Sequence, residues 1–397
     1  MSLIKSLLIA CLVMLMPAAI LAQTNFRWVG TTSGDWNTPT NWSDDSTGAA
    51  VGTVPNALTV SAVFRQSSSN TTLNLATGVS LQSMQFTATP SAYIIGGQGI
   101  TFTSSGFVSV AATVATNQTI NSNITTSGPF TLNNDSTTSG QSLVFGGTVT
   151  GSGAITKTGN GVVTLGGTNN GFSGAVNVNA GTLQVTGTTG TGTVTVNTGG
   201  TLAGTGKVTG ATTVVALGGT IRGDSGTGTG NLLLSGNTTL NGSPTGSLAS
   251  NIRTSLAVSS GTINSNSKLS LVGGTNVLNL DNVQGTTRNM NVYLDNDSGL
   301  ILNKAYTITL AIADTNSLTR FERNGGNGTQ LYTASDINLF SGTNSYTFTN
   351  VQLSRGILGS NTLDITFTAV PEPSLLFGAA AGLIGLVGLR KKLVKQA

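Results

Sequence analysis

Three short segments spaced 19 residues apart, Ala180-Gly181-Thr182-Leu183, Gly199-Gly200-Thr201-Leu202 and Gly218-Gly219-Thr220-Ile221, decide the fold of this 397-residue chain. Short alternating runs such as Val176-Asn177-Val178 and Val194-Thr195-Val196 lie between them. Strands of a few residues, glycine corners and a period of about 20 residues are typical of a β-solenoid, whose stacked coils bury one continuous narrow core. The chain is therefore predicted to be all-β, with a β-solenoid that is like a parallel β-helix.

The residue alternation predicts which side chains enter the core. Valine and leucine are expected to point inward, while threonine and asparagine point outward. Residues 71–287 are expected to form the solenoid, and Gly261-Thr262-Ile263 is expected to continue the phase after about two further coils. A body of about 300 residues at this period gives about 15 coils. A β-sandwich or barrel also uses short strands, but it does not explain a fixed spacing.

A second pattern lies inside the repeats. Residues 151–167 alternate glycine with apolar residues around an internal Lys-x-Gly, and Ala180-Gly181-Thr182-Leu183 closes the unit. This pattern resembles the autotransporter-associated β-strand repeat, most clearly over residues 150–225. Asn170-Gly171-Phe172-Ser173-Gly174 stands where that family usually has Asn-Thr-Tyr-Ser/Thr-Gly. The resemblance implies the solenoid architecture and is almost silent about activity.

In the C-terminal segment, residues 370–397, the arrangement of residue types is typical of a targeting signal rather than of a folded domain. An uncharged run over 375–389 follows Pro371-Glu372-Pro373 and precedes the basic residues Arg390, Lys391, Lys392 and Lys395. As a single hydrophobic helix this run is about 22 Å long, against a hydrocarbon core of about 30 Å, so it spans a membrane only marginally. Basic residues behind such a helix stay on the cytoplasmic side, which predicts that the body lies outside the cytoplasm. An ordinary transmembrane helix or a buried core helix is the alternative.

These residues resemble the PEP-CTERM sorting signal of Gram-negative bacteria, with Val-Pro-Glu-Pro, a short apolar helix and a terminal Arg/Lys cluster in order. The resemblance implies recognition by an exosortase, a membrane transpeptidase with a catalytic cysteine. Such an enzyme would cut near Pro371, Glu372 and Pro373 and release or transfer the body. These three residues are then substrate residues, and the helix is held in the inner membrane only for a time. Arg390, Lys391 and Lys392 complete the signal.

The N-terminal segment, residues 1–22, is predicted to be a secretory signal peptide. Lys5 precedes an apolar stretch over residues 7–20, and cleavage is expected between Ala22 and Gln23. A lipoprotein site at Cys11 is the alternative, but it comes too early and leaves a long apolar run after the cut. Both ends therefore predict a protein that is secreted across the inner membrane to the cell envelope or beyond it.

Composition excludes several classes of function. The whole chain has 17 basic and 13 acidic residues, but residues 23–369 hold 12 of each, so the mature body is neutral. It has no basic footprint for nucleic acid or for an anionic membrane surface. The chain has no histidine and the mature body no cysteine, which excludes imidazole or thiolate zinc sites and the usual nucleophilic triads.

Two segments differ from the repeats. Residues 23–70 hold the three tryptophans, Trp28, Trp36 and Trp42, and resemble the segment that often precedes such repeats in PEP-CTERM proteins. We expect an aromatic cap over the first coil; a glycan-stacking platform is the alternative. Residues 288–369 hold larger side chains and longer strands, which predicts a C-terminal β region, either wider coils or a small β-sandwich.

Candidate catalytic and metal-binding groups are few. The 11 aspartates and single glutamate of the body are scattered, and Asp224, Asp281 and Asp295 share no coil interval, so the spacing predicts no carboxylate pair for glycoside hydrolysis. Asp295-Asn296-Asp297-Ser298-Gly299 could be a calcium loop, but it lacks the closing glutamate and a turn is favoured. Arg222-Gly223-Asp224 is the tripeptide that integrins read, and here its glycine fits a repeat corner. No catalytic residue, cofactor or metal is predicted.

The sequence as a whole favours a secreted structural or adhesive protein of the cell surface or extracellular matrix. Its expected partners are the exosortase and an exopolysaccharide or further copies of itself. A polysaccharide-cleaving β-helix enzyme is the second hypothesis, and a groove with three or more close carboxylates would favour it. An autotransporter passenger is the third; it requires a terminal membrane β-barrel, which the basic tail does not resemble.

Overall fold

The computed structural model describes residues 24–371 apart from short internal gaps. The gaps are 89, 139, 170, 227, 243–248, 274–276, 280–289, 315–320, 323–336, 344–345 and 358–360. The predicted signal peptide, its cleavage site at Ala22 and Gln23, and the predicted C-terminal helix lie outside the described residues. So do Glu372, Pro373, Arg390, Lys391 and Lys392.

The described residues form an all-β fold in which the chain winds through three sheets. The first sheet runs in parallel through β1 (Thr24–Trp28), β3 (Val60–Phe64), β5 (Val79–Phe86), β7 (Ile100–Val110), β10 (Phe130–Asn134), β13 (Ile155–Thr158), β15 (Val176–Val178), β17 (Val194–Val196), β20 (Thr212–Val215), β23 (Asn237–Leu240), β27 (Leu278–Asn279) and β30 (Phe321–Glu322). β2 (Trp42–Asp44) pairs antiparallel with β1 at one edge. β9 (Ile124–Thr126) and β12 (Val149–Thr150) pair beside the first part of β7.

The second sheet is parallel along its main path. It runs through β4 (Thr72–Leu75), β6 (Ile94–Gly97), β8 (Gln118–Ile120), β11 (Ser142–Phe145), β14 (Val162–Leu165), β16 (Gly181–Val185), β18 (Gly200–Gly204), β21 (Thr220–Arg222), β24 (Asn251–Ser259), β28 (Met290–Asp295) and β31 (Ile337–Ser341). β25 (Thr262–Asn266) pairs antiparallel with β24.

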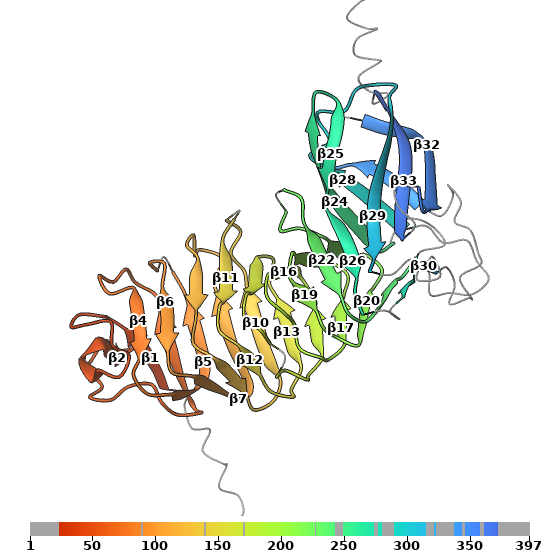
Figure 1. Cartoon of the computed structure of the whole chain (residues 1–397). Helices are drawn as coiled ribbons and strands as arrows, with labels where there is room; N and C mark the ends of the chain where they lie inside the picture. Colours follow the sequence, from red (N-terminus) through yellow and green to blue (C-terminus); the bar gives the residue numbers. More distant parts are fainter. Residues whose placement is uncertain are drawn as a thin grey trace, which may run out of the picture.

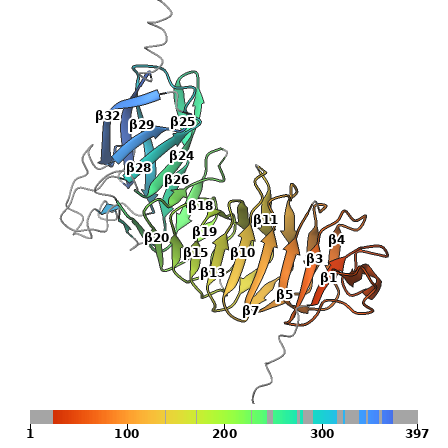
Figure 2. The ribbon, with the colours of Figure 1, turned by 180° about the vertical axis from the view of Figure 1, so that it is seen from behind.

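The third sheet belongs to the C-terminal half. Its order is β19 (Lys207–Val208), β22 (Asn231–Leu234), β26 (Lys268–Leu271), β29 (Ala305–Ala313), β33 (Thr362–Pro371) and β32 (Tyr346–Arg355). From β18 onward the chain visits the second, third and first sheets in turn, which makes each coil three-sided. Figures 1 and 2 show the coils side by side from β1 to β20, with the longer C-terminal strands rising from the end of the row.

The 19-residue phase is confirmed by the strand register. Gly181 pairs with Gly200 in the parallel ladder of β16 and β18, and Thr201 pairs with Thr220 in the ladder of β18 and β21. Gly181 has a φ of +60°, a left-handed conformation that costs glycine little and other residues more. The repeated segments are therefore successive rungs of one sheet, as predicted.

Two details of the predicted repeat are wrong. The rung after Thr220 begins at Asn251, not at Gly261-Thr262-Ile263. Thr262 instead lies in β25, which folds back on β24 as an antiparallel hairpin. Coils beyond Arg222 are longer than 19 residues because loops are inserted between the sheets. Coils before residue 155 are also longer than 19 residues, since Ser61 pairs with Ser83 and Leu132 with Lys157, so the first sheet has 12 parallel rungs in the described residues rather than about 15.

The predicted alternation of buried and outward side chains is confirmed. In β15 both valines are buried and Asn177 between them is not, and β17 repeats this pattern around Thr195. Stacked coils join these side chains into one hydrophobic core from the tryptophans to the last strand. Burial of one such aliphatic side chain stabilises a fold by about 1.5–3 kcal/mol, so a regular stack is stable without disulfides.

The predicted aromatic cap is present at the N-terminal end. Trp36 and Trp42 have ring centroids 4.7 Å apart, and Trp28 lies 5.1 Å from Trp42, each pair in an edge-to-face arrangement. All three tryptophans are at most 1% exposed. Because a glycan needs an open ring face, the alternative of a glycan-stacking platform on these tryptophans is wrong.

Of the two predicted kinds of packing in the C-terminal β region, the structure shows the continued coils, together with antiparallel strand pairs. Parallel coils continue past residue 288, since β24 pairs with β28 and β28 with β31. The third sheet ends instead in antiparallel pairs of β29 with β33 and of β33 with β32. Tyr306 and Phe367 stack across the first of these pairs at 5.7 Å.

Candidate functional site

The outer face of the second sheet carries two neighbouring rows of side chains at its C-terminal end. The first, here the amide row, comprises Thr220, Asn251, Asn291 and Asn338, which are successive partners in the parallel ladders. The second, here the aromatic row, comprises Arg222, Arg253, Tyr293 and Phe340, partners in the same ladders. The core residues Ile221, Ile252 and Val292 lie between the rows in sequence and point to the other face.

The amide row is joined by hydrogen bonds from coil to coil. Asn338 Nδ2 donates to Asn291 Oδ1, and Asn291 Nδ2 donates to Asn251 Oδ1, each at 3.1 Å. Asn251 Nδ2 donates to Thr220 Oγ1 at 3.3 Å. These bonds hold the side-chain amides of the row in a fixed orientation.

The aromatic row is a stack that runs along the solenoid. The Arg253 guanidinium lies 5.2 Å from the centroid of the Tyr293 ring, and the Tyr293 and Phe340 rings stack at 5.0 Å with 22° between their planes. Both contacts join residues of adjacent strands, which are about 4.8 Å apart. β31 is the last strand of this sheet, and Phe340 at the end of the stack is 41% exposed.

Two ion pairs hold the arginine end of this row. Arg253 makes a two-point contact with Asp295, with Nε and Nη2 at 3.0 and 2.5 Å from its two oxygens. The hydrogen bonds and charge of Asp295 raise the pKa of Arg253 further against the cost of burial. Arg222 Nη2 contacts Asp224 at 2.7 Å and Asp295 at 3.2 Å, which links the two pairs. Both arginines are thereby fixed on the sheet.

Arg222-Gly223-Asp224 is closed on itself. Arg222 Nε donates to Asp224 Oδ1 at 2.7 Å, and Asp224 is only 2% exposed. Burial raises the pKa of Asp224, but hydrogen bonds from Ser267, Arg222 and Gly226 outweigh it and leave the pKa lowered. The tripeptide is not presented to a receptor, in agreement with its assignment to a repeat corner.

The segment Asp295–Gly299 forms a turn, as favoured. Asn296 has a φ of +58°, Asp295 is ion-paired, and Asp297 is buried and accepts a hydrogen bond of 2.5 Å from Thr343 Oγ1. Across the parts of the chain that the structure describes, no group of three or more His, Cys, Asp or Glu side chains could hold a metal ion.

The structure does bring two scattered carboxylates together, which the spacing did not predict. Asp224 and Asp295 contact the same nitrogen, Arg222 Nη2, because β21, β24 and β28 stack although their residues are far apart in sequence. A glycosidase pair needs one carboxyl group with a raised pKa as the acid. The lowered pKa of Asp224 does not fit that role.

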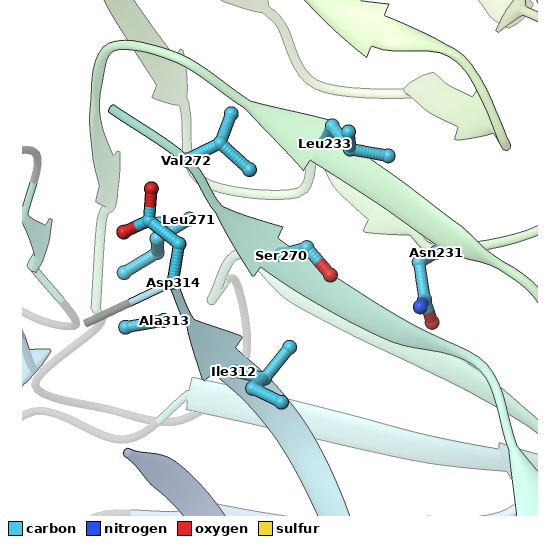
Figure 3. Close-up of a pocket in the computed structure, with 8 residues that line it drawn as sticks. All are labelled: Asn231, Leu233, Ser270, Leu271, Val272, Ile312, Ala313 and Asp314. Carbon is cyan, nitrogen blue, oxygen red and sulfur yellow. The ribbon is translucent and has the colours of Figure 1, made fainter. Parts of the chain in front are cut away.

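A shallow cavity of about 280 Å³ lies on the outer face of the third sheet. Figure 3 shows its lining from β22, β26 and β29: Asn231, Leu233, Ser270, Leu271, Val272, Ile312, Ala313 and Asp314. Its one carboxylate, Asp314, accepts a backbone hydrogen bond from Gly273 at 2.6 Å. The cavity is mostly apolar and has no converging set of polar groups.

Of the predicted sorting residues, the described part of the chain includes only Pro371. Pro371 ends β33 and pairs with Tyr346 of the edge strand β32, and Thr347 Oγ1 donates to its carbonyl at 3.3 Å. In the same part of the chain no helix is long and apolar enough to cross a membrane.

A buried lysine marks the repeat unit in the middle of the stack. Lys157 is 0% exposed, and its ammonium donates to the carbonyls of Thr158, Gly159 and Ala180 at 2.7, 2.7 and 3.0 Å. Ala180 belongs to the next coil. The lysine of this Lys-x-Gly segment therefore has a structural role: it joins the corners of two adjacent coils by hydrogen bonds.

Comparison with known proteins bears on this same segment. A family model described as passenger-associated-transport-repeat matches residues 155–185, which comprise β13, β14, β15 and β16. The match supports the resemblance to autotransporter-associated repeats, and a repeat of this kind fits a secreted or outer-surface protein. No curated protein matches the chain.

Sequence reasoning missed the aromatic row. Tyr293 lies in the C-terminal region, which the sequence marks only by its larger side chains, and Phe340 carries no signal of its own. Their ladder partners Arg222 and Arg253 lie in coils of unequal length, so no fixed spacing connects the four residues. The asparagines at Asn251, Asn291 and Asn338 were the available signal, since each stands two residues before a member of the aromatic row.

Proposed function

We propose that this chain is a structural or adhesive protein of the bacterial cell surface or extracellular matrix, and not an enzyme. The observation that carries the proposal is the regular stack of coils, which displays rows of Thr, Asn and Ser along its length while its core is aliphatic. Many equivalent hydrogen-bonding groups on a rigid face suit a repetitive partner better than one small ligand. The match to a passenger-associated repeat supports a surface location.

Delivery by a PEP-CTERM signal is part of the proposal. β33 ends at Pro371, so a cut just beyond this residue would leave every described strand intact. A processing enzyme of the exosortase type would then separate the body from the apolar tail. The body released in this way is neutral, with 12 basic and 12 acidic residues over 23–369.

An exopolysaccharide is the partner that we propose for the released body. The chains of a neutral polysaccharide form hydrogen bonds through their hydroxyl groups. The outer rows of the solenoid carry hydroxyl and amide side chains in fixed register, which can form such bonds. Self-association is the alternative partner, and it would use the same repetitive faces. Nucleic acid is disfavoured because the body carries no excess of basic residues.

The experiment that tests delivery removes Pro371-Glu372-Pro373 in a host with an exosortase system. The native chain is expected to lose mass at its C-terminus and to reach the surface, while the deletion variant keeps its tail and stays with the inner membrane. Ser374→Ala, next to the motif, is the control and should behave as the native chain does. If the deletion variant has the same size as the native chain and reaches the surface equally well, the sorting hypothesis is wrong.

A polysaccharide-cleaving enzyme is the second candidate, and the proximity of Asp224 and Asp295 is the observation in its favour. Both carboxylates are ion-paired with arginine, and the lowered pKa of Asp224 does not suit the proton donor that glycoside hydrolysis needs. We therefore expect no release of reducing ends from neutral polysaccharides by the purified body. Release that is abolished by Asp224→Asn and by Asp295→Asn, in variants that fold, would replace the structural proposal with an enzymatic one.

A further inference from the structure

We propose that the C-terminal end of the second sheet is a binding site for an extended, neutral polysaccharide, with one sugar ring stacked on Phe340. The site comprises the aromatic row and the amide row beside it. The inference rests on the proposed function, because a matrix protein needs a surface that holds the matrix. It adds the residues that do so and the chemical class of the ligand.

The aromatic row has one closed end and one open end. Arg253 covers one face of Tyr293, and Phe340 covers the other. Within the described residues Phe340 has a ring neighbour only on the Tyr293 side, and it is the exposed member of the stack. The apolar face of a pyranose is flat and carries axial C–H groups, which pack on an aromatic face. Such a ring would continue the stack by one position beyond β31.

The amide row supplies polar groups at a repeating distance. Asn251, Asn291 and Asn338 stand on successive strands, about 4.8 Å apart, which is close to the length of one sugar unit in an extended chain. Hydrogen bonds between the side chains fix their orientation before any ligand binds. Because preorganised donors and acceptors lose little conformational entropy on binding, each weak contact contributes to the binding free energy. Asn291 is only 8% exposed, so a polymer aligned with the solenoid would meet chiefly Asn251 and Asn338.

The charges of the site select a neutral ligand. Arg222 and Arg253 are each paired with a carboxylate, Asp224 or Asp295, so the four groups carry no net charge. An anionic polymer would have to compete with these aspartates for the arginines. A neutral sugar can instead bridge the Arg253–Asp295 pair with vicinal hydroxyls, since a guanidinium donates and a carboxylate accepts.

The test uses the folded body and soluble neutral polysaccharides as probes. Affinity electrophoresis through gels with hydroxyethylcellulose, laminarin or galactomannan measures the dissociation constant, and alginate serves as the anionic comparison. At least one neutral polymer is expected to retard the native body. Phe340→Ala should weaken this binding by about tenfold or more, as loss of a central aromatic contact does.

Matched variants separate loss of binding from loss of fold. Phe340→Leu keeps an apolar side chain but has no ring face, so it should weaken binding as Phe340→Ala does, with an unchanged unfolding midpoint. Ile94→Ala is the control: Ile94 is 43% exposed on the outer face of β6 in the same sheet, far from the proposed site. It should bind as the native body does.

Three outcomes would overturn the inference: no retardation by any neutral polymer, retardation by alginate alone, or native affinity in Phe340→Leu. None of them touches delivery, which the deletion of Pro371-Glu372-Pro373 tests in cells. A protein that reaches the surface and fails these binding tests would keep the proposed function and lose this site.

Discussion

The ammonium of Lys157 lies 3.0 Å from the carbonyl oxygen of Ala180, which belongs to the next coil of the solenoid. The same group donates at 2.7 Å to the carbonyls of Thr158 and Gly159 in its own coil. The side chain starts from an inward position in register with Val178, and it is fully buried. One lysine therefore satisfies three backbone acceptors at a corner where a coil ends and its neighbour is in contact.

Lys157→Met is expected to destabilise the body by about 1.5–3 kcal/mol, because it leaves three carbonyls without their charged donor. Methionine fills a similar volume, so the packing term is small. Urea unfolding followed by circular dichroism gives the change in midpoint. Lys207→Met, at an exposed position in β19, is the control and should stay close to the native midpoint. Equal midpoints for both variants would show that the hydrogen bonds of Lys157 do not contribute to the stability of the body.

The pH dependence of stability should also report on Lys157. Burial lowers its pKa from 10.5 to about 8, and the attraction of Asp135 opposes the shift. Between these two values the unfolded chain binds the proton and the folded chain does not, so the free energy of unfolding rises with pH in this window. The rise is at most about 3 kcal/mol, and the three carbonyl acceptors reduce it. Unfolding at pH 7.5 and pH 10 measures it; a variant without Lys157 that shows the same rise would contradict the assignment.

Close contact between coils predicts unequal costs for two glycine substitutions. A Cβ on Gly192 would collide with the carbonyl of Gly174 in the preceding coil, whereas a Cβ on Gly199 would meet nothing within 4 Å. Gly199 has a φ of +81°, so alanine there suffers only backbone strain of about 1 kcal/mol. Gly192→Ala should cost about 3 kcal/mol or more. Thermal unfolding of both variants tests the order, and a greater cost at Gly199 would contradict it.

The aromatic cap predicts a large effect at Trp36. Its ring is fully buried, packs on Trp42 at 4.7 Å and donates from Nε1 to the Pro55 carbonyl at 3.3 Å. Trp36→Ala should destabilise the N-terminal coils by about 3–5 kcal/mol. Limited proteolysis should then cut first in the N-terminal coils, while Leu58→Ala, at a 44% exposed site in the same segment, keeps the native pattern. Native resistance in Trp36→Ala would mean that the first coil needs no cap.

The fold was largely predictable because its signal is local. Glycine, threonine and an aliphatic residue recur where each coil turns into the second sheet, and a fixed period turns that local pattern into a register. The prediction failed where the period changed. After Arg222 the coils lengthen by different amounts, so the rung at Asn251 could not be located from spacing alone.

The candidate site could not be predicted for the same reason. Asp224 and Asp295 meet at Arg222, and Tyr293 meets Phe340, only because unequal coils end in register. Buried and exposed tryptophans also look alike in a sequence, and the contacts among Trp28, Trp36 and Trp42 distinguish a cap from a platform. Neither the exposure nor the partners of these residues could be predicted from the sequence, since both depend on neighbours from other coils.

Acid should weaken the corner that follows β21 through Asp224. This carboxylate is buried, accepts hydrogen bonds from Arg222 Nε at 2.7 Å and from the Gly226 N–H at 2.6 Å, and has a lowered pKa. A carboxyl group whose pKa is lower in the folded state contributes stability above its unfolded pKa of about 3.9, and this stability is lost as the pH falls through the folded value. Asp224→Asn should therefore be less stable than the native body at pH 7 and lose less on going to pH 3.

Asp295 makes this effect dependent on a second residue. Since Arg222 also contacts Asp295, a single substitution leaves the guanidinium one carboxylate, and the double variant Asp224→Asn, Asp295→Asn leaves it none. The cost of the double variant should exceed the sum of the single costs by about 0.5–3 kcal/mol, as expected for residues in one network. The two single variants give the separate costs with which the double variant is compared. Additive costs in urea unfolding at pH 7 would show that the two aspartates act independently, and the ion pairs at this end of the aromatic row would then not form one network.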